Sequence, residues 1–309
     1  MGNYEKTREC GRTPYQPGRR TFGKAVLAGV LGGPAAFSSI AQTDEGQLRS
    51  NKRTRGGRSG MKLALMLRPE DNERWVLARQ IGVNHAIVPL SSVLNKITPD
   101  KYLDKLAEIK ATYEASGLSI AGVESHPVAA EKIKLGLPGR DEEIANYCAV
   151  IEALGKVGIP MCCYNFMAGI GWYRTRVDIP ERGGALASEF DSQIAERQGL
   201  TRWGRISEEK IWDNLTYFLK RIIPVAEKAN VKMALHPDDP PLSPLRGIGR
   251  ILTSGEAFRR VLQIVPSPVN GIAFCQAPYE KVDPYDRPYY YYCLKNHSCF
   301  HNFSRWSSF

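Results

Sequence analysis

From Met61 onward, the chain alternates short apolar runs rich in β-branched residues with longer amphipathic stretches. Short continuous apolar runs are typical of buried strands, whereas apolar positions repeated every three or four residues are typical of helices. The apolar runs predict strands at residues 61–67, 83–89, 118–124, 159–165, 231–236 and 269–275. The amphipathic stretches predict helices near 70–81, 99–116, 140–157, 207–229 and 254–264.

Local signals support two of these helices. In 99–116, apolar residues recur at helical spacing, namely Tyr102, Leu103, Leu106, Ile109 and Tyr113. Gly117 follows directly, and glycine is the residue that most often ends a helix. Ser207 precedes the 207–229 stretch and is a suitable N-cap.

The regular order of strand and helix predicts a parallel sheet covered by helices. Two architectures fit this order, a doubly wound sheet and a (β/α)₈ barrel. No GxGxxG motif follows the first strand, which weakens the dinucleotide-binding version of the first. Polar residues lie instead at the C-terminal ends of several strands, namely Glu124, Asn165, His236 and Cys275. Because side chains from many strand ends form the active site of a barrel, we predict a TIM-barrel-like α/β fold.

The connection after the fourth strand, residues 166–206, is far longer than an ordinary loop between a strand and a helix. It contains Trp172, Tyr173 and Trp203 among several arginines. These aromatic residues favour an ordered lid over a disordered insertion, the alternative interpretation.

The net charge of +10 lies mostly in the first 60 residues, so the folded part offers no basic surface for nucleic acid. In this segment Arg19 and Arg20 precede a short run rich in glycine and alanine. This pattern predicts a twin-arginine export signal over 1–41, then a linker over 42–60, and a periplasmic or exported protein. The alternative is a disordered basic tail on a cytoplasmic protein. The apolar run is too short for a stable membrane span.

His236 and Cys275 end consecutive predicted strands and should be neighbours on one rim. An imidazole and a thiolate aimed at one point can bind a divalent transition ion such as Zn²⁺ or Mn²⁺. The alternative is that both are structural. None of the seven cysteines forms a CxxC pair, which disfavours a zinc knuckle or a redox dithiol.

Three further side chains are candidates for substrate contacts. Asp238 could orient the histidine, cap the following turn or bind a substrate hydroxyl. Arg174 could clamp a substrate carboxylate with two hydrogen bonds, or be a solvated surface residue. Glu124 could act as a general base or anchor a hydroxyl, or form an ion pair with a basic neighbour.

Several motifs together resemble the mannonate dehydratase family. They are "VESHPV" (123–128), "IKLGLPGRDEEIANY" (133–147), "CYNFM" (163–167), "WYRTR" (172–176), "HPDDPP" (236–241) and "GIAFCQ" (271–276). The resemblance implies a TIM barrel that dehydrates D-mannonate, a small sugar acid, to 2-keto-3-deoxygluconate with Mn²⁺ or Fe²⁺. It also implies that His236 and Cys275 are metal ligands, and it strengthens Asn165 and Arg174 as substrate contacts. The catalytic acid and base are not assigned.

The resemblance ends near residue 276. We expect a barrel domain over 61–276 and an atypical tail over 277–309, without an apolar run for a seventh or eighth strand. A truncated and inactive enzyme is the interpretation that this tail suggests. The competing functions are a sugar isomerase or epimerase on the same barrel, and a non-catalytic sugar-acid-binding remnant. A homo-oligomer is compatible with all three.

Overall fold

The computed structural model describes residues 62–70, 73–275 and 299–301 of the 309-residue chain. The chain divides into two compact units, Met1–Arg58 and Ser59–Phe309, and every described residue belongs to the second. The predicted export signal over 1–41 and linker over 42–60 lie outside the described residues and stay predictions, as does most of the 277–309 tail.

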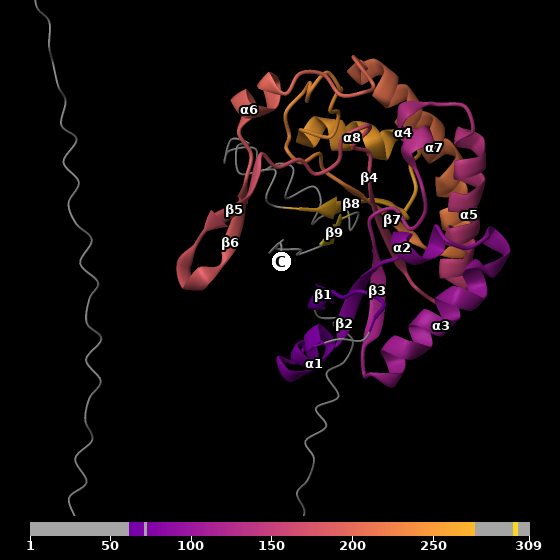
Figure 1. Cartoon of the computed structure of the whole chain (residues 1–309). Coiled ribbons are helices and arrows are strands. Elements are labelled where there is room, and N and C mark those ends of the chain that lie inside the picture. Colours follow the sequence, from indigo (N-terminus) through magenta and orange to yellow (C-terminus); the bar gives the residue numbers. More distant parts are fainter. Residues whose placement is uncertain (1–61, 71–72, 276–298, 302–309) are drawn as a thin grey trace, which may run out of the picture. The chain divides into compact units, whose positions relative to one another are not determined.

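A parallel sheet forms the centre of the described unit (Figure 1). Its strands are β1 (Ala64–Met66), β2 (His85–Pro89), β3 (Ser119–Glu124), β4 (Met161–Asn165), β7 (Lys232–His236), β8 (Asn270–Phe274) and β9 (Cys299–His301). They are hydrogen-bonded in the order β1-β2-β3-β4-β7-β8-β9, with β1 and β9 as the two edges. The predicted parallel order of the first six strands is therefore confirmed, and the described strands form an open part of a barrel.

The predicted helices are all present. The helices of the structure are α1 (Glu73–Gln80), α2 (Ser91–Leu94), α3 (Tyr102–Ala115), α4 (Glu131–Leu135), α5 (Arg140–Val157), α6 (Ser192–Arg197), α7 (Glu208–Ala229) and α8 (Gly255–Ile264), with a 3₁₀ turn η1 at Pro99–Lys101. Ser207 caps α7 as predicted, because its Oγ accepts a hydrogen bond from the Lys210 amide. The helices α2 and α4 are too short to show a periodic pattern and were not predicted.

The two faces of the sheet have different surroundings. Helix α3 packs against α5, α5 against α7 and α7 against α8, which places this layer along one face (Figure 1). Strand residues Cys162, Met233 and Ile272 belong to the large core beneath the helices. Their neighbours along the chain form a separate small cluster on the opposite, interior face, made of Cys163, Ala234 and Ala273. Because side chains alternate along a strand, Asn165, His236 and Cys275 follow on this interior face.

The long connection after β4 contains ordered elements. Strands β5 (Arg176–Pro180) and β6 (Leu186–Glu189) form an antiparallel hairpin, with a 3₁₀ turn η2 (Arg182–Gly184) between them and α6 after it. The hairpin projects from the body of the unit (Figure 1). The alternative of a structureless insertion is therefore wrong, and we call residues 166–206 the lid segment.

One expectation about the tail needs correction. Residues Cys299–His301 form β9, which pairs in parallel with β8. A three-residue strand carries too little apolar sequence to stand out in a polar tail, and it is recognised by its hydrogen bonds with β8. Among the described residues, none of the helices combines the length and the apolar composition needed to cross a membrane.

Candidate active site

The polar residues at the strand ends meet at the carboxyl edge of the sheet. Asn165 and His236 are direct partners in the register of β4 and β7. Glu124 ends β3, and Cys275 follows β8, the strand next to β7. All four side chains are buried, with exposed fractions of 4% for Glu124 and Asn165, 3% for His236 and 7% for Cys275. The predicted gathering of these residues at one edge is confirmed by the strand order.

His236 is held in one orientation by the loop that follows it. Its Nδ1 lies 2.7 Å from the carbonyl oxygen of Pro237, and a carbonyl only accepts, so Nδ1 carries the proton and donates it. The other ring nitrogen, Nε2, then carries the lone pair that a metal ion requires. Burial lowers the pKa of His236, which favours the same neutral form. Trp172 of the lid segment contacts the ring edge-on, with 5.5 Å between ring centroids.

The side chains at this edge include nitrogen and sulfur atoms of the kind that bind transition-metal ions. His236 offers a nitrogen, and Cys275 offers a buried thiol that is in no disulfide. Imidazole and thiolate are ligands for divalent transition ions such as Fe²⁺ and Zn²⁺. Within the described ranges, no group of three or more His, Cys, Asp or Glu side chains is arranged to hold a metal ion. The assignment of His236 and Cys275 as metal ligands therefore stays a prediction.

Asp238 stabilises the loop after β7. Its Oδ2 accepts a hydrogen bond from the Leu252 amide at 2.9 Å, and the Asp238 amide donates to the Leu252 carbonyl at 3.0 Å. Its Oδ1 lies 3.6 Å from Nη1 of Arg250, and both side chains are fully buried. Burial raises the pKa of Asp238, and the charge of Arg250 opposes this shift. Of the roles considered for Asp238, these contacts favour that of holding the turn.

Arg174 ties the lid segment to the same loop. Its two terminal nitrogens donate to the two carboxylate oxygens of Asp239, at 2.9 and 2.7 Å. The alternative of a solvated surface arginine is therefore wrong. The guanidinium makes the bidentate pair of hydrogen bonds expected for recognition of a carboxylate, but the carboxylate that it binds here is that of Asp239. Substrate binding by Arg174 stays a prediction, and it requires the ion pair with Asp239 to break.

Three residues to which the sequence reasoning gave no role support the site, although His126 was already part of the "VESHPV" strand end. Lys134 on α4 donates from Nζ to Oδ1 of Asn165 at 2.8 Å. His126 lies 2.6 Å from the Asn165 carbonyl oxygen through Nε2, which must be the donor in this contact. Arg250 donates from Nη2 to the carbonyl oxygens of Ile170 and Gly171, both at 2.9 Å. A charged residue inside an apolar stretch, as in "IKLG" and "GRIL", was the available signal.

Lys134 gives the site a titration near neutral pH. Burial lowers the pKa of Lys134 from 10.5 to about 7, with a contribution from Arg250, while Asp238, Glu131 and Glu143 oppose the shift. Between about pH 7 and pH 10.5, Lys134 is protonated in the unfolded chain and deprotonated in the folded chain. The free energy of unfolding should therefore rise with pH across this window.

We expect Lys134→Met to flatten this dependence. Urea unfolding is followed between about pH 7 and 8.5, and since histidine and cysteine also titrate near these values, the difference between variants isolates the contribution of Lys134. The wild-type protein should gain stability with pH, and Lys134→Met should gain less. The exposed Lys132, on the same helix, provides the control through Lys132→Met. Parallel pH profiles for wild type and Lys134→Met would contradict the assigned titration.

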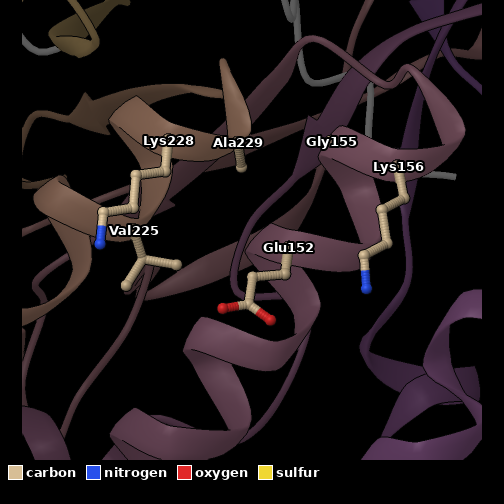
Figure 2. A pocket seen from close by; sticks show the side chains of 6 residues that line it. All are labelled: Glu152, Gly155, Lys156, Val225, Lys228 and Ala229. Carbon is tan, nitrogen blue, oxygen red and sulfur yellow. The ribbon is translucent and has the colours of Figure 1, made fainter.

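A hollow of about 390 Å³ lies elsewhere in the unit (Figure 2). It is lined by Glu152, Gly155, Lys156, Val225, Lys228 and Ala229. These residues belong to the last turns of α5 and α7, which lead into β4 and β7. The hollow is therefore at the amino end of the strands, opposite to the edge that carries His236, and it takes no part in the candidate site.

Comparison with known proteins agrees with this geometry. A sequence profile for D-mannonate dehydratase matches residues 78–204 and 192–286. The mannonate dehydratase of Streptococcus equi subsp. zooepidemicus is 41% identical over 201 residues, covering 57% of this chain and 55% of the relative. That of Thermotoga maritima is 38% identical over 203 residues, covering 56% of each chain. The chain thus spans a little over half the length of these curated relatives.

A solved structure shows the same fold. The mannonate dehydratase from Streptococcus suis serotype 2 superimposes with a TM-score of 0.65 and 32% sequence identity, over 79% of this chain and 72% of that chain. The resemblance predicted from the motifs is confirmed by sequence and by fold. Since the profile covers more than half of the residues, the chain belongs to the D-mannonate dehydratase family.

Proposed function

We propose that this protein is a hydro-lyase that removes water from D-mannonate with a divalent metal, Mn²⁺ or Fe²⁺, at His236 and Cys275. The observation that carries the proposal is the orientation of His236. Its Nδ1 donates a hydrogen bond to the Pro237 carbonyl oxygen, so Nε2 is the nitrogen that can bind a metal. Cys275 follows the neighbouring strand of the same sheet. Membership of the D-mannonate dehydratase family supports the choice of reaction and substrate.

The reaction removes the proton α to the carboxylate and the hydroxyl group at C3, which leave together as one molecule of water. The resulting enol becomes 2-keto-3-deoxygluconate. A bound divalent ion would act as a Lewis acid toward negative charge on substrate oxygens.

The chain's own residues supply binding and enclosure. Asn165 lies beside His236 in the register and can donate to a substrate oxygen. Glu124 ends β3 as a buried carboxyl group and is the candidate base or hydroxyl anchor. Trp172 covers the imidazole from the lid segment, which limits the access of water to this side of the site.

The test is product formation by the full chain. Purified protein with Mn²⁺ or Fe²⁺ and D-mannonate should form a 2-keto-3-deoxy acid, detected by NMR, and chelation should abolish it. Binding of Mn²⁺ should be measured separately by calorimetry. His236→Ala and Cys275→Ser should each weaken Mn²⁺ binding by more than about 100-fold, because loss of a direct ligand costs more than loss of its supporting residues.

Matched controls are available in the same unit. His85→Ala removes a half-buried histidine that bonds Ser119, and Cys148→Ser removes a half-buried cysteine on α5. Both variants should bind Mn²⁺ as the wild type does. Equal Mn²⁺ affinity in His236→Ala and His85→Ala would contradict the metal assignment. A metal-loaded wild type that forms no keto acid would contradict the proposed reaction.

A further inference from the structure

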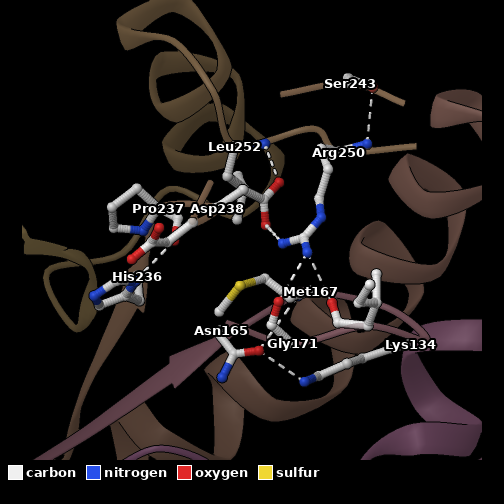
Figure 3. Close-up of polar contacts among 12 residues, drawn as sticks. Lys134, Asn165, Met167, Gly171, His236, Pro237, Asp238, Ser243, Arg250 and Leu252 are labelled. Atoms are coloured by element: carbon white, nitrogen blue, oxygen red, sulfur yellow. Dashed lines mark hydrogen bonds and ion pairs between the residues drawn. The ribbon is translucent and has the colours of Figure 1, made fainter. Parts of the chain in front are cut away.

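The side-chain amide of Asn165 is held on one side only. Its Oδ1 lies 2.8 Å from Nζ of Lys134 and 3.3 Å from the backbone nitrogen of Met167. Figure 3 shows the Lys134 ammonium reaching the oxygen of this amide, with the nitrogen turned away from it.

These two contacts decide which end of the amide is which. The oxygen and nitrogen of an amide are told apart by their partners. The backbone N–H of Met167 can only donate, so the atom that it contacts must be the acceptor, Oδ1, and Lys134 then donates to the same oxygen. The donor group, Nδ2, is then on the opposite side. In the described part of the chain, no hydrogen bond uses Nδ2 of Asn165.

Lys134 is itself fixed in place. Nδ2 of Asn214, on α7, donates to the Lys134 carbonyl oxygen at 2.9 Å. The preceding amide, that of Ile133, donates to Oε2 of Glu143 on α5 at 3.1 Å. Helix α4 is therefore anchored to two long helices, which fixes the backbone from which the Lys134 side chain reaches Asn165 on β4.

We propose that Lys134 is a positioning residue that locks the Asn165 amide, so that this edge of the site presents N–H donors to a carboxylate oxygen of the substrate. The inference rests on the proposed function and deepens it. Asn165 neighbours His236 on the interior face, where the sugar acid would lie. Because Lys134 holds the oxygen, the other end of the amide presents N–H donors, which an anionic oxygen can accept. An amide turned the other way would present its own oxygen and repel the carboxylate. The arrangement therefore favours a carboxylate over a neutral hydroxyl at this position, because hydrogen bonds to charged acceptors are stronger.

The experiment compares D-mannonate binding and turnover in a small set of variants of the full chain with Mn²⁺. Lys134→Met leaves the amide oxygen with only the 3.3 Å contact to the Met167 amide, and we expect the Kd and KM for D-mannonate to rise about tenfold or more, with a smaller change in kcat. Lys134→Arg keeps a donor and should restore most of the affinity. Lys132→Met, on the same short helix, should behave as the wild type. D-Mannitol, which lacks the carboxylate, should bind poorly to every variant.

A second variant keeps the proposal testable if Lys134→Met does not fold. Asn165→Asp retains an acceptor for Lys134 but replaces the N–H donors with a carboxylate oxygen, so D-mannonate binding should be lost. Wild-type affinity in Asn165→Asp, or equal affinity in Lys134→Met and Lys132→Met, would overturn the inference. Absence of D-mannonate binding by the wild type would overturn the inference and the proposed function together. Binding without loss of water would contradict the proposed function alone.

Discussion

Replacing Arg250 by methionine should lower the free energy of unfolding by about 3–5 kcal/mol, the usual cost of removing one partner of a buried ion pair. Arg250 is 1% exposed, and its guanidinium lies between the carboxylate of Asp238 and the carbonyl oxygens of Ile170 and Gly171. Methionine fills much of the volume but donates no hydrogen bond. Asp238 would then be left as a buried charge without its partner. The carbonyl oxygens of Ile170 and Gly171, near the start of the lid segment, would lose their hydrogen-bond donor.

Urea denaturation of wild type and variant measures this effect directly. The control is Arg259→Met on α8, where the arginine pairs with Glu256 at 2.6 Å on the surface and should cost at most about 1 kcal/mol. Adding Asp238→Asn to Arg250→Met should recover part of the loss, because the uncompensated charge is removed. A loss below about 1 kcal/mol for Arg250→Met would show that the buried pair is not needed for stability.

Phe218→Ala is expected to cost a similar 3–5 kcal/mol through a cavity in the core. The ring is fully buried on α7, and its centroid lies 5.1 Å from that of Tyr147, 5.9 Å from that of Tyr164 and 6.0 Å from that of Phe166. Tyr164 and Phe166 flank Asn165 in the sequence. The cavity should therefore loosen the end of β4 as well as the packing of α7.

The matched control for Phe218→Ala is Phe190→Ala, which removes a half-buried ring that contacts Tyr173 in the lid segment. This change should cost about 1 kcal/mol, as is usual outside a packed core. Phe218→Leu should lie between the two, since it keeps most of the apolar volume. Equal losses for Phe218→Ala and Phe190→Ala would contradict the assigned position of Phe218 at the centre of the core.

The order of elements could be predicted from the sequence because it depends on local patterns. The predicted helix over 140–157 matches α5 at both ends, where Gly139 and Gly158 adopt left-handed backbone conformations. The predicted strands are present but are one to four residues shorter than the apolar runs, since pairing stops before the apolar sequence does. Elements of three to five residues, such as α4 and β9, escaped prediction because so short a stretch shows no period.

The sequence by itself determined which residues stand at the strand ends, because a continuous apolar run followed by a polar residue is a local feature. It thus placed Asn165, His236 and Cys275 at one edge of the sheet. Only the tertiary structure decided the partners of the charged side chains. Arg174 meets Asp239 and Lys134 meets Asn165 across long separations in the chain, and Arg250 meets Asp238 through the folding of the loop between β7 and α8. Such pairs depend on how helices and loops pack around the sheet, and no local pattern encodes the distance between two side chains that folding brings together.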